Sequence, residues 1–201
     1  IYKKKSHSIS WRPYPGKLPS ISNPCFVLFP QHGGKDLLKS FLKEEEFPAG
    51  KLLQRQGHPS NKIWFISKGF IIGNYIEQDE LRTCLFCMSG DFAVSVPAFF
   101  HQGMSPENLI TRQDCQLLSL NYESLRELRN VPSLSRAYKG IIARYEEESL
   151  QRMRSLLYDS PAVRLQKLLD RYPGLLKSAY PEEVASYLGI SRRTLYRFLL
   201  L

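Results

Sequence analysis

The stretch Tyr180-Pro-Glu-Glu-Val-Ala-Ser-Tyr-Leu-Gly-Ile-Ser-Arg-Arg-Thr-Leu-Tyr-Arg-Phe198 predicts two short helices joined by a tight turn. Pro181 suits the first turn of a helix, and the two glutamates after it suit the positive end of the helix dipole. Gly189 ends this helix, Ile190 can fill the angle, and Ser191 can cap a second helix. Such an arrangement is typical of a helix-turn-helix.

The second of these helices is strongly basic. In a helix-turn-helix, the second helix enters the major groove of double-stranded DNA with its N-terminal residues at the base edges. Arginine suits this place because its planar fork pairs with guanine or with phosphate. The residues expected to contact DNA are Ser191, Arg192, Arg193, Thr194, Tyr196 and Arg197. The alternative is an amphipathic helical hairpin that closes a domain and leaves its arginines in solvent.

The composition also favours a polyanionic partner. The 201 residues carry a formal net charge of +9, and the pI is near 9.4. A chain of 23.3 kDa has room for one large domain or two small ones. There is no run of about 18 apolar residues, and the start Ile1-Tyr-Lys-Lys-Lys-Ser6 lacks the apolar core of a signal peptide. We therefore expect a cytoplasmic protein without a membrane partner.

The four cysteines and four histidines form no metal or redox pattern. Cys84 and Cys87 lie in a strand-like run, and residues three apart on a strand face opposite sides unless a bulge intervenes. The histidines are dispersed, without the close spacing of metal ligands. We expect buried thiols, no metal, no cofactor and no catalytic centre.

Short apolar runs separated by turns occupy the first half of the chain. A short helix is expected from Lys35 to Glu45, where apolar residues recur at helical spacing. The runs that predict strands are Lys51–Arg55, Ile63–Ser67, Phe70–Ile76, Leu81–Met88 and parts of Leu109–Leu120. Several strands at such short intervals favour a small antiparallel barrel or jelly roll.

A long helix is predicted from Ser133 to Leu157, after a short helix that ends near Arg129. Its apolar residues recur at coiled-coil spacing. The residues expected to form the seam of a homodimer are Leu134, Tyr138, Ile141, Tyr145 and Leu156. Ser149 and Arg152 weaken this seam. An apolar stripe also suits a helix that packs on its own barrel, and this alternative stays open.

The sequence Asp159-Ser-Pro161 predicts a hinge, because proline discourages an uninterrupted helix and Ser160 can cap the next one. A helix from Ala162 to Tyr172 follows. We thus expect an α+β chain in four parts: an N-terminal arm at 1–34, an antiparallel β jelly-roll barrel at 35–132, a dimerisation helix at 133–158, and a winged-helix-like helix-turn-helix domain at 159–201.

Two sets of motifs accompany this order of elements. In the barrel they are Phe47-Pro-Ala-Gly50-Lys-Leu-Leu, Gly57, Ile63-Trp-Phe-Ile-Ser-Lys-Gly69, Gly90-Asp-Phe92 and Asp114-Cys-Gln-Leu-Leu118. In the second domain they are Ser160-Pro-Ala-Val-Arg-Leu165, Arg171-Tyr-Pro173 and Val184-Ala-Ser-Tyr-Leu-Gly-Ile-Ser191. From about Lys35 onward the chain resembles the Crp/Fnr family of bacterial transcription regulators, in particular the Crp-like regulators of Bacteroidetes. The resemblance implies a cyclic-nucleotide-binding-like barrel, dimerisation, DNA binding and, for an activator, contact with RNA polymerase.

The resemblance also implies an effector pocket in the barrel. Its expected lining is Gly90, Asp91, Phe92, Ser105 and Asn108. Members that bind cyclic nucleotides carry a Gly-Glu pair and an Arg-Ser/Thr-Ala triplet, whose arginine neutralises the cyclic phosphate. Here Gly90-Asp91 stands at the first site, but Ser105-Pro106-Glu107 stands at the second, and Glu107 would repel phosphate. Arg112, further on, could swing into the site. We expect that the protein does not bind cyclic AMP with useful affinity; two alternatives stay open, that the pocket binds another effector of unknown identity or that it only transmits structure.

Comparison with the reading helix of the family implies a distinct operator. Arg192 and Arg197 match arginines of that helix, whereas Arg193 stands where the best-known members have a glutamate. Two other functions stay open. A Crp-like protein that binds a different ligand or a protein partner and has lost DNA reading is one, because the chain stops at Leu199-Leu200-Leu201. A cupin-type metal enzyme is the other, but it would need clustered histidine and carboxylate ligands.

Overall fold

The computed structural model describes residues 40–200, apart from the side chains of Ser133, Leu134, Arg136 and Ala137. The expected arm at 1–34 and the start of the helix expected at 35–45 lie outside the described residues. The strands are β1 (Lys43–Phe47), β2 (Leu52–Gln54), β3 (Lys62–Lys68), β4 (Phe70–Glu77), β5 (Glu80–Met88), β6 (Phe92–Ala93), β7 (Asn108–Thr111) and β8 (Cys115–Asn121). The helices are α2 (Val96–Phe100), α3 (Tyr122–Leu128), α4 (Pro132–Tyr158), α5 (Pro161–Arg171), α6 (Leu175–Ser178), α7 (Pro181–Leu188) and α8 (Arg192–Leu199).

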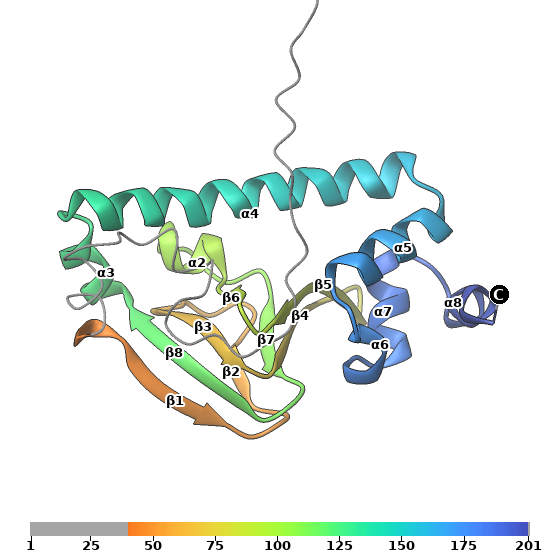
Figure 1. Ribbon diagram of the computed structural model, residues 1–201, viewed down its shortest axis with the longest axis horizontal. Coiled ribbons are helices and arrows are strands. Elements are labelled where there is room, and N and C mark those ends of the chain that lie inside the picture. Colours follow the sequence, from red (N-terminus) through yellow and green to blue (C-terminus); the bar gives the residue numbers. More distant parts are fainter. Residues whose placement is uncertain (1–39, 201) are drawn as a thin grey trace, which may run out of the picture.

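The strands form two antiparallel sheets, which together make the predicted jelly-roll barrel (Figure 1). One sheet has the order β1-β8-β3-β6 and the other has the order β2-β7-β4-β5. Each apolar run of the sequence corresponds to a strand, with the last run divided between β7 and β8. The two-residue strand β6 and the short helix α2 have no periodic signal in the sequence.

A long hairpin of β4 and β5 forms the edge of the second sheet. Gln78 and Asp79 make its turn, with φ angles of 52° and 61° in the left-handed region. A two-residue turn of this kind matches the twist of the strands that it joins. The register shifts between Gly73 and Asn74, which leaves Cys84 as an extra residue in β5. Gly73 suits this place, because a Cβ there would lie 2.7 Å from the Cβ of Leu85.

Residues 43–47 form a strand, so the prediction of a helix extending to Glu45 was wrong at this end. Lysine and glutamate are good helix formers, and local propensity therefore favoured a helix. In the structure β1 pairs with Cys115–Ser119 of β8. The Nζ of Lys62 lies 2.7 Å from Oε1 of Glu45, and Phe47 packs on a barrel core. Pairing with a neighbouring strand here outweighs the helical preference of single residues.

The predicted long helix is present as α4, which runs along the barrel and continues to the C-terminal helices (Figure 1). Its 27 residues span about 40 Å at a rise of roughly 1.5 Å per residue. Pro132 occupies its first turn, where a missing N–H costs nothing. The backbone is extended at Asp159 and Ser160, and α5 begins at Pro161. The chain therefore turns at the expected hinge.

Helices α5 to α8 form the C-terminal domain, and its described residues include no strand. The strand pair of a winged helix, which the sequence predicts, is not present within residues 159–200. One buried cluster joins this domain to the barrel. It contains Phe70, Ile72 and Phe86 of the barrel together with Leu165, Leu168, Tyr172, Leu175, Ala179, Val184, Ala185, Leu188 and Leu195. Of the helices between residues 40 and 200, none combines the length and apolar character that crossing a bilayer requires.

Candidate nucleic-acid interface

The turn between α7 and α8 has the geometry that the sequence predicted. Gly189 ends α7 with a φ of 65°, in the left-handed region. The N–H of Ile190 donates to the carbonyl of Ala185 at 3.0 Å, which closes the end of the helix. Ser191 then caps α8, since its Oγ accepts a hydrogen bond from the N–H of Thr194 at 3.1 Å. Local hydrogen bonds in the turn therefore fix the two helices relative to each other.

Helix α8 has one buried side and a basic exposed side. Leu195 is completely buried, in contact with the cluster that contains Val184 and Leu188 of α7. Of the six residues predicted to contact DNA, Thr194 is half-buried and the exposed ones are Ser191, Arg192, Arg193, Tyr196 and Arg197. The helix lies at the outer end of the molecule, away from the barrel (Figure 1). A row of arginines is thus presented to solvent on a packed base.

Two contacts modify this basic face. Arg192 forms an ion pair with Glu182 of α7, and both side chains are more than half exposed. Such a pair stabilises the fold little and can exchange for another partner. Ser191 and Thr194 share a hydrogen bond of 2.9 Å between their hydroxyl groups, so both belong to the helix cap. Beyond Arg197, Leu199 and Leu200 are exposed by 40% and 86%.

One side of helix α7 docks on strand β5 of the barrel. The Oγ of Ser186 accepts a hydrogen bond from the N–H of Thr83 at 2.9 Å. The ring of Tyr187 lies 4.8 Å from that of Phe86, measured between centroids. The hydroxyl of Tyr172, in the same domain, donates to the carbonyl of Phe86 at 2.8 Å. The barrel therefore holds the helix-turn-helix through its first helix.

Arg112 forms part of this docking. Its Nη2 lies 2.7 Å from Oε1 of Glu183, at a place where both side chains are largely buried. The other oxygen of Glu183 accepts the N–H of Tyr180 at 3.0 Å, which caps α7. From the sequence, Arg112 could swing into the expected effector site. In the structure it is instead held by the helix-turn-helix.

The predicted cassette residues satisfy one another's hydrogen bonds. Ser105 is 2% exposed, and its Oγ lies 3.0 Å from Oγ of Ser95 and 2.6 Å from the carbonyl of Glu107. Asn108 donates to Oδ1 of Asn74 at 3.0 Å and accepts the N–H of Gln56 at 2.9 Å. Both side chains thus brace the barrel wall.

Gly90 and Asp91 lie elsewhere, in the turn that leads into β6, and Phe92 is the first residue of β6. The Oδ2 of Asp91 accepts the N–H of Met88 at 3.0 Å, and its Oδ1 lies 3.3 Å from Nη2 of Arg144 in α4. Burial raises the pKa of the Asp91 carboxyl, partly offset by Met88 and Arg144. Asp91 and Phe92 line a cavity of about 60 Å³, which neither Ser105 nor Asn108 reaches. The structure does not bring the five predicted pocket residues together.

A larger cleft of about 490 Å³, the barrel cleft, opens between the barrel, α4 and the C-terminal domain. Its polar lining residues include Glu107, Tyr145, Glu148, Arg152 and Arg171. Burial raises the pKa of Glu107, which Ser95 partly offsets. Burial acts on Glu148 in the same direction, but Arg171 and Arg144 outweigh it and hold the pKa of Glu148 below its ordinary value. The pKa values of two carboxyl groups in one cleft are therefore shifted in opposite directions.

From the sequence, Arg152 is expected only to weaken the seam of a homodimer. It donates to the carbonyls of Cys84, Thr83 and Tyr187, the last two at 3.3 Å. Its guanidinium also lies 4.1 Å from the centroid of the Tyr187 ring. Arg152 thus ties α4 to β5 and to α7 at once. A lone arginine in an apolar stripe was the signal that could have found it.

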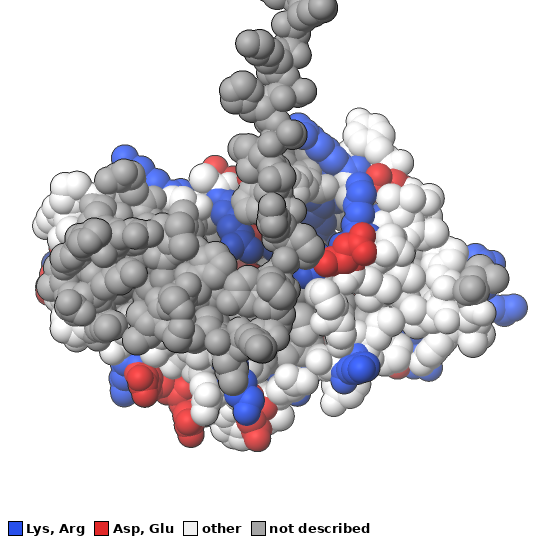
Figure 2. All heavy atoms as spheres, viewed as in Figure 1, with Lys and Arg blue, Asp and Glu red and all other residues white. Residues whose placement is uncertain are grey.

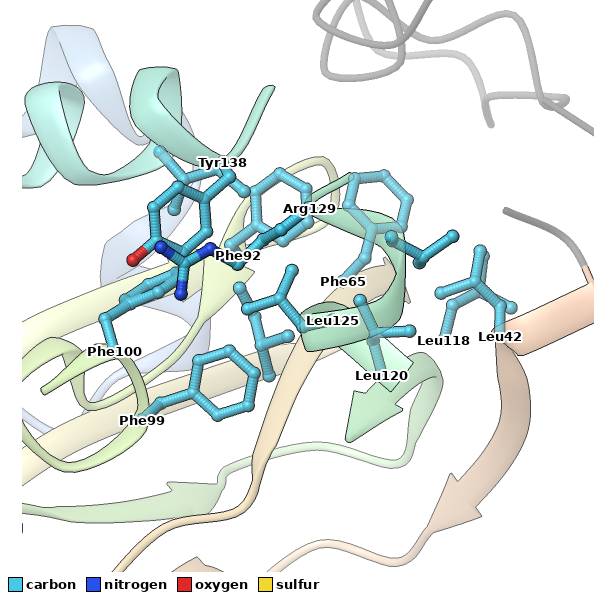
Figure 3. A pocket seen from close by; sticks show the side chains of 13 residues that line it. Leu42, Phe65, Phe92, Phe99, Phe100, Leu118, Leu120, Leu125, Arg129 and Tyr138 are labelled. Carbon is cyan, nitrogen blue, oxygen red and sulfur yellow. The ribbon is translucent and has the colours of Figure 1, made fainter. Parts of the chain in front are cut away.

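The predicted dimer seam is largely occupied by the chain's own barrel. Tyr138, Ile141 and Tyr145 pack against barrel core residues. The Tyr138 ring lies 5.1 Å from that of Phe100 and 4.9 Å from the guanidinium of Arg129. Figure 3 shows Tyr138, Phe100 and Arg129 among the side chains around an apolar cavity, whose volume is about 50 Å³. The alternative of a helix packed on its own barrel therefore describes these three residues.

Leu156 is 42% exposed, and the side chain of Leu134 lies outside the described part of the chain. Other apolar side chains of α4 are more exposed: Leu150 by 49%, Met153 by 52% and Leu157 by 68%. Their spacings of three and four residues place them on one face of the helix. This exposed face is displaced from the predicted dimer seam.

Cys84 and Cys87 form the C-x-x-C pair within residues 40–200. Cys84 occupies the bulge of β5 and lines the barrel cleft, while Cys87 is in a buried core. Burial raises the pKa of the Cys84 thiol to about 12 and that of Cys87 well above its ordinary value. Thiols of this kind stay protonated and unreactive at neutral pH. Within residues 40–200, no three His, Cys, Asp or Glu side chains gather as metal ligands would.

Comparison with known proteins agrees with the fold described above. Residues 44–130 match the family model of the cyclic nucleotide-binding domain. No curated protein matches the chain.

Solved structures resemble most of the chain. FixK2 from Bradyrhizobium japonicum has a TM-score of 0.69 at 15% identity, with 79% of this chain and 83% of that chain covered. The catabolite activator protein of Thermus thermophilus has a TM-score of 0.56 at 22% identity, covering 89% and 85%. A transcriptional regulator of the Crp/Fnr family from Eubacterium rectale has a TM-score of 0.64 at 13% identity, covering 83% and 80%. The chain thus has the fold of the Crp/Fnr transcription regulators, and its residues 44–130 are similar to the cyclic nucleotide-binding domain.

Proposed function

We propose that this chain is a homodimeric, sequence-specific DNA-binding transcription regulator without catalytic activity. The observation that carries the proposal is the exposed arginine face of α8 on its buried base at Leu195. A helix of this kind can enter the major groove, where the fork of an arginine discriminates guanine from other bases. The resemblance to Crp/Fnr regulators supports the same assignment.

A gel-shift series with the upstream region of its own gene tests this proposal. The wild-type chain should form a specific complex whose affinity falls steeply as salt increases. Arg192→Ala should remove about 1–3 kcal/mol of discrimination between bases, because it deletes a bidentate contact. Arg126→Ala is the matched control, since Arg126 is also exposed but lies on α3. Binding that is equal for all sequences in the wild type, or unchanged by Arg192→Ala, would contradict the proposal.

The dimer is proposed to form through the exposed face of α4 at Leu150, Met153 and Leu157. A second copy of the same face would bury these side chains, and dimers of this class match the symmetry of palindromic sites. Analytical ultracentrifugation should show a dimer for the wild type and a monomer for Leu150→Glu. Leu81→Glu, at another exposed leucine of 58% exposure in β5, should leave the dimer intact. A Leu150→Glu chain that stays dimeric would place the interface elsewhere.

The effector is proposed to be a ligand other than cyclic AMP. Ser105 occupies the place of the phosphate-binding arginine, Glu107 is a buried carboxyl beside it, and Arg112 is paired with Glu183. Burying a phosphate next to an unneutralised carboxylate is unfavourable. Titration calorimetry with cyclic AMP should give no binding in the low micromolar range, and a clear isotherm there would overturn this part.

A further inference from the structure

A second cleft, the hinge cleft, lies where α4 turns into α5. It has a volume of about 520 Å³ and lies between the last turns of α4, the hinge at Asp159 and one side of α5. Leu156, Leu168 and Leu188 give it an apolar lining. A volume of this order is typical of sites for small molecules.

The lining of the hinge cleft carries a surplus of positive charge. Its cationic residues are Arg152, Arg154, Arg164, Lys167 and Arg171, and its carboxylates are Glu148 and Asp159. Figure 2 shows Lys and Arg atoms bordering a hollow beside α4, with acidic atoms at one edge. Three positive charges therefore remain when the two carboxylates are matched.

Both carboxylates already have cationic partners. The Nζ of Lys167 lies 2.7 Å from Oδ2 of Asp159, and Nη2 of Arg171 lies 2.7 Å from Oε1 of Glu148. The guanidinium of Arg152 is turned to backbone carbonyls of β5 and α7. No carboxylate pairs with Arg152, Arg154 or Arg164, and of these three only Arg152 is held by β5 and α7. The remaining two are Arg154 and Arg164.

The two remaining arginines lie on opposite sides of the hinge. Arg154 is exposed on α4 and has no ion pair or hydrogen bond with any described residue. Arg164, on α5, donates from Nη1 to the carbonyl of Asp159 at 2.9 Å. Its Nε is buried and finds no acceptor among the described residues. A buried donor without a partner is costly, and an acceptor on a bound molecule would satisfy it.

We infer that the hinge cleft binds a small molecule that carries a di- or triphosphate group. Guanidinium groups suit phosphate because their planar forks make paired, charge-assisted hydrogen bonds. The apolar lining at Leu156, Leu168 and Leu188 can hold the uncharged body of such a molecule. The site is separate from the predicted cassette, because neither Ser105 nor Asn108 lines it.

Such a ligand would bridge the long helix and the C-terminal domain. It would contact Arg154 on α4 and Arg164 on α5, and so favour the arrangement in which both lie on one cleft. Any effect on DNA affinity rests on the proposed function, whereas binding itself does not. Phosphate on DNA is the other source of the same chemistry, and the experiment distinguishes the two.

Isothermal titration calorimetry of the full chain with inorganic tripolyphosphate tests the inference. The wild type should bind with an affinity that falls as salt increases, and the ion should raise the melting temperature. The double variant Arg154→Gln, Arg164→Gln should lose about tenfold or more in affinity, because each charged hydrogen bond contributes on this scale. Arg154→Gln alone decides the matter if Arg164→Gln impairs folding, since Arg154 is exposed and unpaired among the described residues.

Two matched controls give the result its meaning. Arg126→Gln on α3 and Arg192→Gln on α8 should each leave tripolyphosphate affinity within about twofold. Equal losses in all variants would show that the ion binds wherever arginines gather, and would overturn the site. It would also fall if the double variant bound tripolyphosphate normally but lost affinity for DNA of every sequence. Conversely, a chain that fails to bind DNA but passes this test would refute only the proposed function.

Discussion

The predicted cassette of the barrel and helix α8 differ in the direction of their polar side chains. Ser105 and Asn108 are turned inward and bonded to the protein. Arg193 and Arg197 are turned outward on α8. Polar groups that satisfy one another hold a wall together, whereas exposed cations are available to a partner. Ser105 stands where the phosphate-binding triplet of the family is missing, whereas Arg192 and Arg197 of α8 match arginines of the family and are exposed.

The largest expected effect concerns the buried side of α8. Leu195→Ala should lower the free energy of unfolding by about 2–5 kcal/mol, because Leu195 is fully buried and its removal leaves a cavity. Urea unfolding followed by circular dichroism measures this change. Leu199→Ala, at a residue 40% exposed, should cost far less. Similar losses in both variants would mean that α8 has no distinct buried base.

A smaller effect is expected inside the barrel. Ser105→Ala should cost about 1–3 kcal/mol, because it leaves the buried partners of Ser105 without a hydrogen bond. Arg193→Ala should change stability by less than about 0.5 kcal/mol while weakening DNA binding. The two variants together test the contrast between inward and outward polar groups. It would fail if Ser105→Ala left stability unchanged.

The smallest effect concerns the pH dependence of stability through Glu107. Burial raises its pKa in the folded chain, so the folded state keeps this proton at pH values where the unfolded chain has lost it. Stability should therefore fall as pH rises from the unfolded pKa of about 4.3 to the higher folded value, by about 1.4 kcal/mol per unit of difference.

Thermal unfolding of Glu107→Gln over this pH range measures the contribution of Glu107 to the pH dependence of stability. The variant should lack this decline and be more stable than the wild type at neutral pH. Glu44→Gln, at an exposed residue of β1, should keep the wild-type slope. If stability depended on pH in Glu107→Gln as it does in the wild type, the carboxyl of Glu107 in the wild type would be well solvated, which would contradict the prediction.

Much of the fold could be predicted because its signals are local. Gly189 and Ser191 act within their own helix ends, and their backbone geometry follows the expectation. The alternation of apolar runs and turns likewise located most strands. The seam of α4 could not be located in this way, because one apolar stripe suits a barrel and a second helix equally. Only the packing of Tyr138 and Tyr145 on the barrel separates the two.

The site was harder to predict because it depends on contacts between distant segments. Arg112 and Glu183 are 71 positions apart, and no spacing rule connects them. Arg152 weakened a predicted seam in the sequence, yet it contacts three backbone carbonyls on two elements. Polar residues within an apolar stripe mark such junctions, but their partners emerge only from the tertiary arrangement.

The cluster that joins barrel and C-terminal domain bears on how such regulators can diversify. Phe86 of the barrel lies among residues of the C-terminal helices such as Leu168 and Leu188. A genetic exchange that replaced residues 159–200 with the equivalent segment of another regulator would have to fit this surface of β5. Under the proposed function, new DNA specificities should therefore arise more readily by point substitutions on α8 than by recombination of whole domains.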